Sequence, residues 1–152
     1  MSSIADREIA VTRIFDAPRE LVWKVWTEPN HIALWWGPNG FTNSVESMDV
    51  SVGGKWKYMM HGPDGVDWPN LITYLEVKKP ELLAYMHGDF DNPDHFRVTV
   101  KFESVGEKTK IYMQMVFKTA EERNAVVEKH GAVEGLNQNM DKLEKYLVGM
   151  KA

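Results

Sequence analysis

The residues from Ala132 to Met150 follow a helical pattern that constrains the whole fold. Apolar residues recur there at alternating steps of three and four, namely Val133, Leu136, Met140, Leu143, Leu147 and Met150. This spacing places them in one stripe along a helix, with charged and amide residues on the far side. Burying each such side chain is worth roughly 1.5–3 kcal/mol. The stripe therefore needs a surface to lie on, and we expect the preceding residues to supply it.

Segments in which apolar and polar residues alternate precede this helix and predict β-strands. The predicted strands, in chain order, are Glu8–Phe15, Phe41–Val52 (where the alternation is imperfect), Lys55–His61, Leu71–Val77, Leu82–His87, Phe96–Glu103 and Lys110–Phe117. The Gly62-Pro63-Asp64-Gly65 segment is a strong turn, and the Gly53-Gly54 pair suits a bulge or a sharp bend. Short turns between consecutive strands indicate a curved antiparallel sheet of about six strands.

Three shorter helices complete the predicted elements. Two follow the first strand: one begins near Pro18 and the other spans His31–Trp36. A third opens with a capping box formed by Thr119 and Glu122 and is closed by Gly131. The sequence thus predicts a single α+β domain over residues 1–152, with the curved sheet wrapped around the long C-terminal helix. This arrangement is a helix-grip fold.

The composition excludes several classes of function. The chain has 152 residues and no cysteine, so disulfides, thiolate metal sites and cysteine nucleophiles are excluded. A net charge of −4 argues against nucleic-acid binding. No apolar run approaches the ~18 residues of a membrane span, and the N-terminus lacks the apolar core of a signal peptide. We therefore expect a cytoplasmic protein without a membrane span.

Four ordered motifs resemble those of a known family. They are Val11-x-Arg13-x-Phe15-x-Ala17-Pro18-x-x-x-Val22-Trp23-x-x-Trp26, Pro29-x-x-x-x-x-Trp35-Trp36-Gly37-Pro38-x-Gly40-Phe41, Asp49-Val50-x-Val52-Gly53-Gly54-x-Trp56 and Met60-x-Gly62-Pro63-Asp64-Gly65. The set is similar to the heat-shock-protein-90 ATPase activator homologue family. That family belongs to the START-like (SRPBCC) superfamily of polyketide cyclases, lipid-transfer domains and pathogenesis-related plant proteins. The resemblance covers nearly the whole chain, including the final helix.

The resemblance implies the same helix-grip fold that the periodicity predicts. It also implies a cavity between the sheet and the long helix, which in the superfamily holds apolar or amphipathic small molecules. The eukaryotic co-chaperone that gives the family its name resembles this chain only in its C-terminal domain. We expect no counterpart of its N-terminal chaperone-binding domain within these 152 residues, and hence no substantial stimulation of a chaperone ATPase by this chain alone.

Few residues suggest catalysis or metal binding. None of the five histidines forms an i, i+4 pair on a predicted helix, and no cysteine could complete a zinc set, so neither a metal nor another cofactor is expected. The segment from His87 to His95 is rich in Asp, but Pro93 and Asp94 break the pattern of a calcium loop. We interpret it as an exposed polar loop.

A general base is the remaining catalytic alternative. His87 paired with Glu46 or Asp49 is the best candidate, although Asp49 would serve equally well as an acceptor for backbone N–H groups at the bend of Gly53-Gly54. The motifs of serine nucleophiles, phosphate loops and dinucleotide sites are absent. The sequence therefore favours a protein without catalytic residues.

Aromatic and methionine side chains are the candidates for a cavity wall, because they are bulky and adapt to varied ligands. Each could equally be plain core. Together with the helix stripe and a flanking amide, they give the following cavity candidates: Trp36, Phe41, Trp56, Tyr58, Met60, Tyr85, His87, Phe96, Val98, Met113, Met115, Val133, Leu136, Asn137 and Met140. Asn139 also flanks the stripe, and convergent polar groups of this kind are what a pocket needs.

Three hypotheses of function follow. The first is a non-enzymatic module that binds a hydrophobic or amphipathic small molecule between the sheet and the C-terminal helix. The second is a chaperone-interacting protein, and the third is a cyclase- or hydrolase-like enzyme that uses the same cavity. A monomer or weak homodimer is expected in each case.

Overall fold

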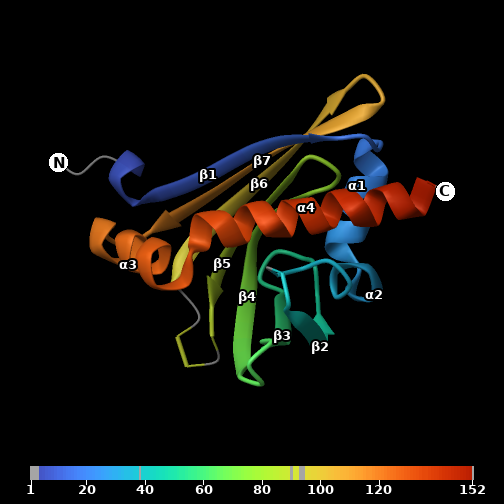
Figure 1. Cartoon of the computed structure of the whole chain (residues 1–152). Coiled ribbons are helices and arrows are strands. Elements are labelled where there is room, and N and C mark those ends of the chain that lie inside the picture. The colour runs from blue at the N-terminus through green and yellow to red at the C-terminus, as the bar shows by residue number, and fades with distance from the viewer. Residues whose placement is uncertain (1–3, 38, 90, 93–94, 152) are drawn as a thin grey trace.

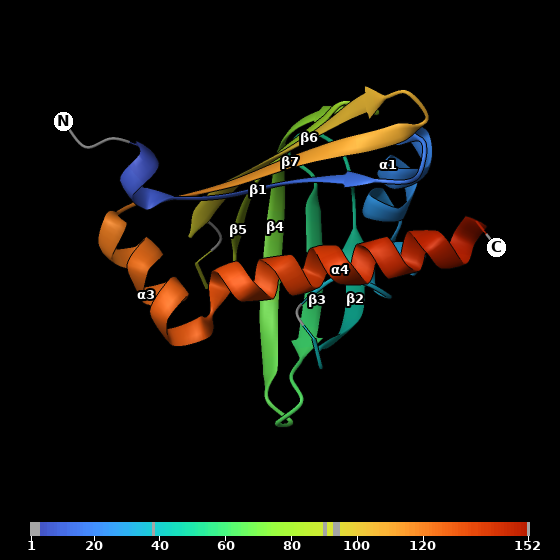
Figure 2. The same cartoon turned by 45° about the horizontal axis from the view of Figure 1, so that its top comes forward.

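The computed structural model describes residues 4–37, 39–89, 91–92 and 95–151. Its elements follow in chain order as η1 (Ile4–Arg7), β1 (Glu8–Phe15), α1 (Arg19–Thr27), α2 (Pro29–Ile32), β2 (Thr42–Met48), β3 (Lys55–His61), β4 (Asp67–Lys78), β5 (Leu82–Gly88), β6 (Phe96–Val105), β7 (Lys108–Phe117), α3 (Ala120–His130) and α4 (Ala132–Lys151). The long helix α4 crosses one face of a strongly curved sheet, as Figures 1 and 2 show. This confirms the predicted α+β helix-grip fold.

The sheet contains seven antiparallel strands in the order β1-β7-β6-β5-β4-β3-β2. The chain meanders from β2 to β7, and β1 then pairs with β7 in the register Glu8↔Val116 to Phe15↔Thr109. The sequence predicted about six strands, so this count was slightly low. Each strand pairs with its neighbour along the chain except at β1, which explains why short turns suffice for most connections.

The two largest errors in the predicted strand boundaries are the end of β2 and the start of β4. Strand β2 ends at Met48 rather than Val52, because Asp49 N donates to Lys55 O at 2.9 Å and closes a turn. Gly54 lies within this turn, and a Cβ atom there would be 2.2 Å from Asp49 O. Strand β4 begins at Asp67, earlier than the predicted Leu71.

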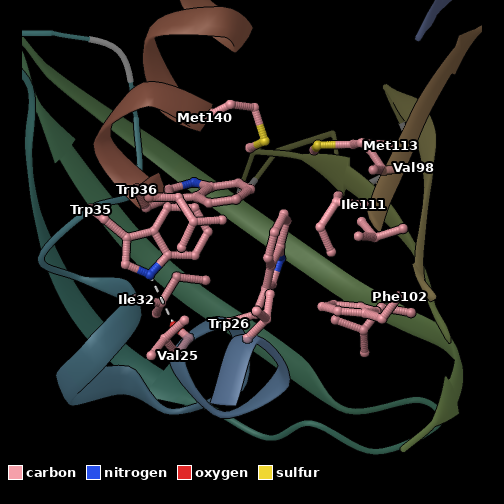
Figure 3. Close-up of a cluster of buried hydrophobic side chains, with 14 of the residues drawn as sticks. Val25, Trp26, Ile32, Trp35, Trp36, Val98, Phe102, Ile111, Met113 and Met140 are labelled. Carbon is pink, nitrogen blue, oxygen red and sulfur yellow. Dashed lines mark hydrogen bonds between the residues drawn. The ribbon is translucent and has the colours of Figure 1, made fainter. Parts of the chain in front are cut away.

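The second short helix, α2, spans Pro29–Ile32 and not His31–Trp36. Trp35 and Trp36 follow it in a turn and point into the core, where Trp35 Nε1 donates to Val25 O at 3.0 Å (Figure 3). Edge-to-face ring contacts join Trp26 to Trp35 at 4.9 Å between centroids and Trp36 to Trp56 at 5.3 Å. Trp36, which the sequence left open as cavity wall or core, thus belongs to a connected cluster of buried indoles.

Helix α4 buries the middle of the predicted stripe but not its ends. Leu136, Met140, Leu143 and Leu147 are at most 6% exposed, whereas Val133 is 42% and Met150 37% exposed. The prediction was wrong at these two positions because they lie in the first and last turns of the helix, and its C-terminal end projects past the sheet (Figures 1 and 2).

Polar contacts fix α4 against the rest of the fold. Arg13 on β1 donates to Asp141 Oδ1 at 2.6 Å, and His31 Nδ1 lies 2.7 Å from Tyr146 Oη. At the start of α3, Thr119 Oγ1 accepts from Glu122 N, which confirms this part of the predicted capping box. None of the described helices is long and apolar enough to cross a membrane.

Candidate functional site

The strand register builds one wall of the candidate site. Directly paired positions point to the same face of a sheet. The pairs Trp56↔Ile72, Ile72↔His87, His87↔Phe96 and Phe96↔Phe117 therefore form a single row across β3, β4, β5, β6 and β7. This row faces α4, and His87 is its one titratable side chain.

A small cavity lies between this wall, helices α3 and α4, and the Trp36-Gly37 segment. Its volume is about 220 Å³. Its lining is mostly apolar and consists of Trp36, Gly37, Met60, His87, Phe96, Met113, Met115, Phe117, Val126, Gly135, Leu136 and Asn139. We call it the inner chamber.

A larger hollow adjoins the inner chamber. Its volume is about 670 Å³, and it is lined by Phe41, Met60, Pro63, Asp64, Trp68, Pro69, Asn70, His87, Gly88, Asp89, His95 and Phe96. We call it the outer chamber. Met60, His87 and Phe96 line both chambers, so these three side chains stand at the boundary between them.

His87 is held by a hydrogen bond to Asn70 on the neighbouring strand. His87 Nε2 lies 2.8 Å from Asn70 Oδ1, and Asn70 Nδ2 donates to Trp68 O at 3.0 Å. Burial lowers the pKa of His87 from its usual 6.5 to about 4, and the nearby His95 contributes to the shift in the same direction. The imidazole is therefore neutral at pH 7.

Tyr58 and Trp36 lie beside His87 in a continuous aromatic group. Trp36 Nε1 donates to Tyr58 Oη at 2.9 Å, and the same oxygen lies 3.4 Å from His87 Nε2. Trp56 stacks on Tyr58 with ring centroids 4.3 Å apart. Burial raises the pKa of Tyr58 far above its usual value, so this hydroxyl stays protonated.

Asn139 on α4 supplies the second polar group of the inner chamber. The residue is only 6% exposed, and its Oδ1 accepts a hydrogen bond from Gly37 N at 3.1 Å. This contact ties the helix to the segment after Trp36. Asn139 Nδ2 has no hydrogen-bond partner among the described residues, and it is not among the fully buried atoms that lack one.

The outer chamber carries negative charge at its rim. Asp89 Oδ1 accepts from the backbone N–H groups of Asp91 and Asn92, and Asp89 Oδ2 lies 3.3 Å from His95 Nε2. The backbone hydrogen bond from Asn92 is the main cause that lowers the pKa of Asp89. The described part of the predicted polar loop thus forms a turn around Asp89; Pro93 and Asp94 lie outside the described residues.

The structure brings eight of the predicted cavity residues to the two chambers: Trp36, Phe41, Met60, His87, Phe96, Met113, Met115 and Leu136. Tyr58 contacts Trp36 and His87 from behind the inner chamber. Trp56, Tyr85, Val98 and Met140 are at most 2% exposed and belong to the core, and neither Trp56 Nε1 nor Tyr85 Oη has a hydrogen-bond partner among the described residues.

Val133 and Asn137 were predicted to line the cavity, but neither lines the inner or the outer chamber. Both are exposed, and Asn137 Nδ2 donates to Val133 O within the helix at 3.1 Å. They line a separate surface depression that shares no residue with the inner chamber. The physical reason is that α4 turns this flank to solvent and the opposite flank to Trp36 and Gly37.

Several lining residues were not among the predicted candidates, including Asn70, Phe117, Val126 and Gly135. Asn70 could have been found from the β3–β4 register, which pairs it with Tyr58. Gly135 carried a weaker signal, since a glycine inside a helix costs about 1 kcal/mol relative to alanine and often marks close packing or open space.

The structure does not bring His87 together with Glu46 or Asp49, the partners predicted for a general base. Asp49 lies in the β2–β3 turn, where its carboxylate accepts from Ser51 Oγ at 2.8 Å and, within the described residues, from no backbone N–H group. Glu46 is exposed on β2. His87 pairs with an amide instead of a carboxylate. Among the described residues, no group of three His, Cys, Asp or Glu side chains could hold a metal ion.

Comparison with known proteins identifies the family of this chain. A family model described as "Activator of Hsp90 ATPase homolog 1-like protein" matches residues 16–148. No curated protein sequence matches the chain.

Solved structures share the fold at low identity. A crystal structure from Mycobacterium smegmatis is 23% identical with a TM-score of 0.87, covering 99% of this chain and 96% of the other. One from Nitrosomonas europaea is 24% identical with a TM-score of 0.85, covering 97% of each chain. An AHSA1-like protein from Aeromonas hydrophila is 20% identical with a TM-score of 0.73, covering 95% of this chain and 94% of the other. On the family match, the chain belongs to the Activator of Hsp90 ATPase homolog 1-like family.

Proposed function

We propose that this protein binds a hydrophobic or amphipathic small molecule in the inner chamber, between the sheet and α4, and in the outer chamber that adjoins it. The observation that carries the proposal is the adjoining pair of volumes, about 220 and 670 Å³, with Met60, His87 and Phe96 common to both. Pockets of roughly this size, lined by apolar side chains with a few polar groups, are typical ligand sites. A ligand could place its apolar body in the inner chamber and extend toward solvent through the outer one.

The lining favours modest and tolerant binding. Met60, Met113 and Met115 contribute flexible thioether chains to the inner wall. Methionine adapts to irregular shapes at little energetic cost. We therefore expect micromolar affinity, about −8 kcal/mol, for several unrelated apolar compounds.

A fluorescent apolar probe and a filled-chamber variant test the proposal. N-phenyl-1-naphthylamine is uncharged and gains emission on leaving water, so titration should give a saturable signal. Gly135 lines the inner chamber, so Gly135→Leu should fill part of it and weaken binding by about tenfold or more, a loss of about 1.4 kcal/mol.

Gly149→Leu is the matched control, because Gly149 is exposed on the same helix and a Cβ atom added there would meet nothing within 4 Å. This variant makes the same glycine replacement in α4 away from the chambers and should leave the affinity unchanged. Absence of saturable binding to the unmodified protein, or equal affinity in the two variants, would contradict the proposal.

A chaperone contact is the second candidate function, favoured by the family match alone. Its test is the steady-state ATPase rate of an Hsp90-type chaperone with and without this protein. Because our proposal places the functional site in the interior, we expect the rate to stay unchanged. A several-fold rise would favour the chaperone function.

A further inference from the structure

The hydrogen-bond pattern fixes which nitrogen of His87 faces a ligand. Asn70 Nδ2 donates to Trp68 O, so Asn70 Oδ1 must be the atom facing His87. An amide oxygen only accepts hydrogen bonds, and His87 Nε2 therefore carries the proton in the neutral ring. His87 Nδ1 is then a pure acceptor. It has no partner among the described residues, and it is not among the fully buried unpartnered atoms, so it is open to the chambers that His87 lines.

The same reasoning assigns a free donor to Asn139. Gly37 N is a donor, so the atom it contacts at 3.1 Å must be Asn139 Oδ1. Asn139 Nδ2 consequently points elsewhere and has no hydrogen-bond partner among the described residues. The residue is only 6% exposed and lines the inner chamber, yet this nitrogen is not sealed off within the protein.

One acceptor and one donor thus serve the same chamber of about 220 Å³. A ligand in this chamber therefore has both an acceptor and a donor residue in its lining. A polar group that a bound apolar ligand cuts off from water without a partner costs free energy, so a ligand that satisfies both is preferred over one that satisfies neither.

The charged residues that line the chambers disfavour an anionic ligand head. Among the described residues, neither lining includes Lys or Arg, while Asp64 and Asp89 line the outer chamber. A carboxylate in the inner chamber would lose its hydration without gaining a cation, and it would present a further acceptor to His87 Nδ1. Trp36, Phe96 and Phe117 supply flat surfaces suited to rings.

We infer that the inner chamber selects uncharged ring compounds bearing a hydroxyl group, which donates to His87 Nδ1 and accepts from Asn139 Nδ2. This inference rests on the proposed function and adds the chemical class of ligand. Phenols and alicyclic alcohols belong to that class; fatty acids and other carboxylates do not.

A series of four naphthalenes tests the selectivity on the unmodified protein by isothermal titration calorimetry at pH 7. The probes are 2-naphthol, 2-methoxynaphthalene, naphthalene and 2-naphthoate. 2-Naphthol should bind roughly five- to fiftyfold tighter than naphthalene, as expected for two hydrogen bonds of ordinary net strength. 2-Methoxynaphthalene accepts but cannot donate and should lie between them. 2-Naphthoate should be the weakest ligand.

The outcomes separate this inference from the proposed function. If naphthalene binds and 2-naphthol binds no tighter, the hydroxyl selection is wrong and the apolar cavity stands. Binding of 2-naphthoate as tight as that of 2-naphthol also overturns the inference. If none of the four compounds binds, the proposed function fails and the inference fails with it.

Two variants test whether Asn139 Nδ2 donates a hydrogen bond to the ligand hydroxyl. Asn139→Asp keeps an acceptor for Gly37 N but removes the amide donor, so the preference for 2-naphthol over naphthalene should fall by about threefold or more. Asn137→Asp adds the same charge at an exposed position of α4 and should leave the preference unchanged. A general loosening of the fold would weaken both ligands together, so an unchanged ratio in Asn139→Asp would show that this amide is not the donor.

Discussion

Acidification should destabilise this protein through His87 before most carboxylates titrate. Burial lowers the pKa of His87 from 6.5 to about 4, so between these values the unfolded chain binds a proton that the folded protein does not. The contribution of neutral His87 to the free energy of unfolding is therefore fully present above about pH 6.5 and is lost as the pH falls toward 4. Below about pH 4 both states carry the proton and this contribution no longer changes.

The structure sets the size of the effect. One pKa unit corresponds to about 1.4 kcal/mol, so the full difference for His87 amounts to about 3 kcal/mol. The ring is partly open to the chambers, where water can reach Nδ1, and this reduces the loss. We expect the free energy of unfolding to fall by about 1–3 kcal/mol between pH 6.5 and pH 4 because of this residue.

His87→Gln isolates this contribution. Glutamine does not titrate, and its amide N–H can still donate to Asn70 Oδ1. Urea denaturation of both proteins at intervals between pH 7 and pH 4 measures the difference. The wild type should lose more stability than the variant across this window. Parallel curves would refute the idea that His87 is held neutral by its site.

Two further predictions concern the packing of α4 and the β2–β3 turn, and chemical denaturation checks both. Leu143→Ala removes a fully buried side chain from α4 and should lower the free energy of unfolding by roughly 2–5 kcal/mol. Val148→Ala, at a position that is 62% exposed, should change it by no more than about 0.5 kcal/mol. Equal losses would mean that the buried face of α4 is misassigned. Gly54→Ala would bring a Cβ within 2.2 Å of Asp49 O and should cost more than about 1 kcal/mol, and a neutral result would contradict the geometry of the β2–β3 turn.

Periodicity was sufficient to predict the fold. Alternation in Phe96–Glu103 and Lys110–Phe117 fixed which side chains of β6 and β7 are inward, and the three-four spacing identified the centre of the α4 stripe. The ends of the stripe were mispredicted because a helical pattern does not reveal how far the covering sheet extends. Val133 and Met150 satisfy the spacing and are still exposed.

Periodicity alone could not predict which residues line the chambers. Trp56 and Met60 share the inward face of β3, but only Met60 reaches the chambers while Trp56 is sealed in the core. Position along the strand decides between them, and this depends on where the helices and loops lie. Asn137 and Asn139 flank the stripe on opposite sides, and the sequence does not say which flank meets Trp36.

The most direct test of the central claim is a crystal structure of the protein grown with saturating 2-naphthol. We expect the naphthalene rings to lie in the inner chamber between Trp36 and Phe96, with the hydroxyl oxygen within hydrogen-bond distance of His87 Nδ1 and Asn139 Nδ2. An inner chamber without the compound, in a crystal where 2-naphthol occupies another surface, would contradict a ligand site between the sheet and α4.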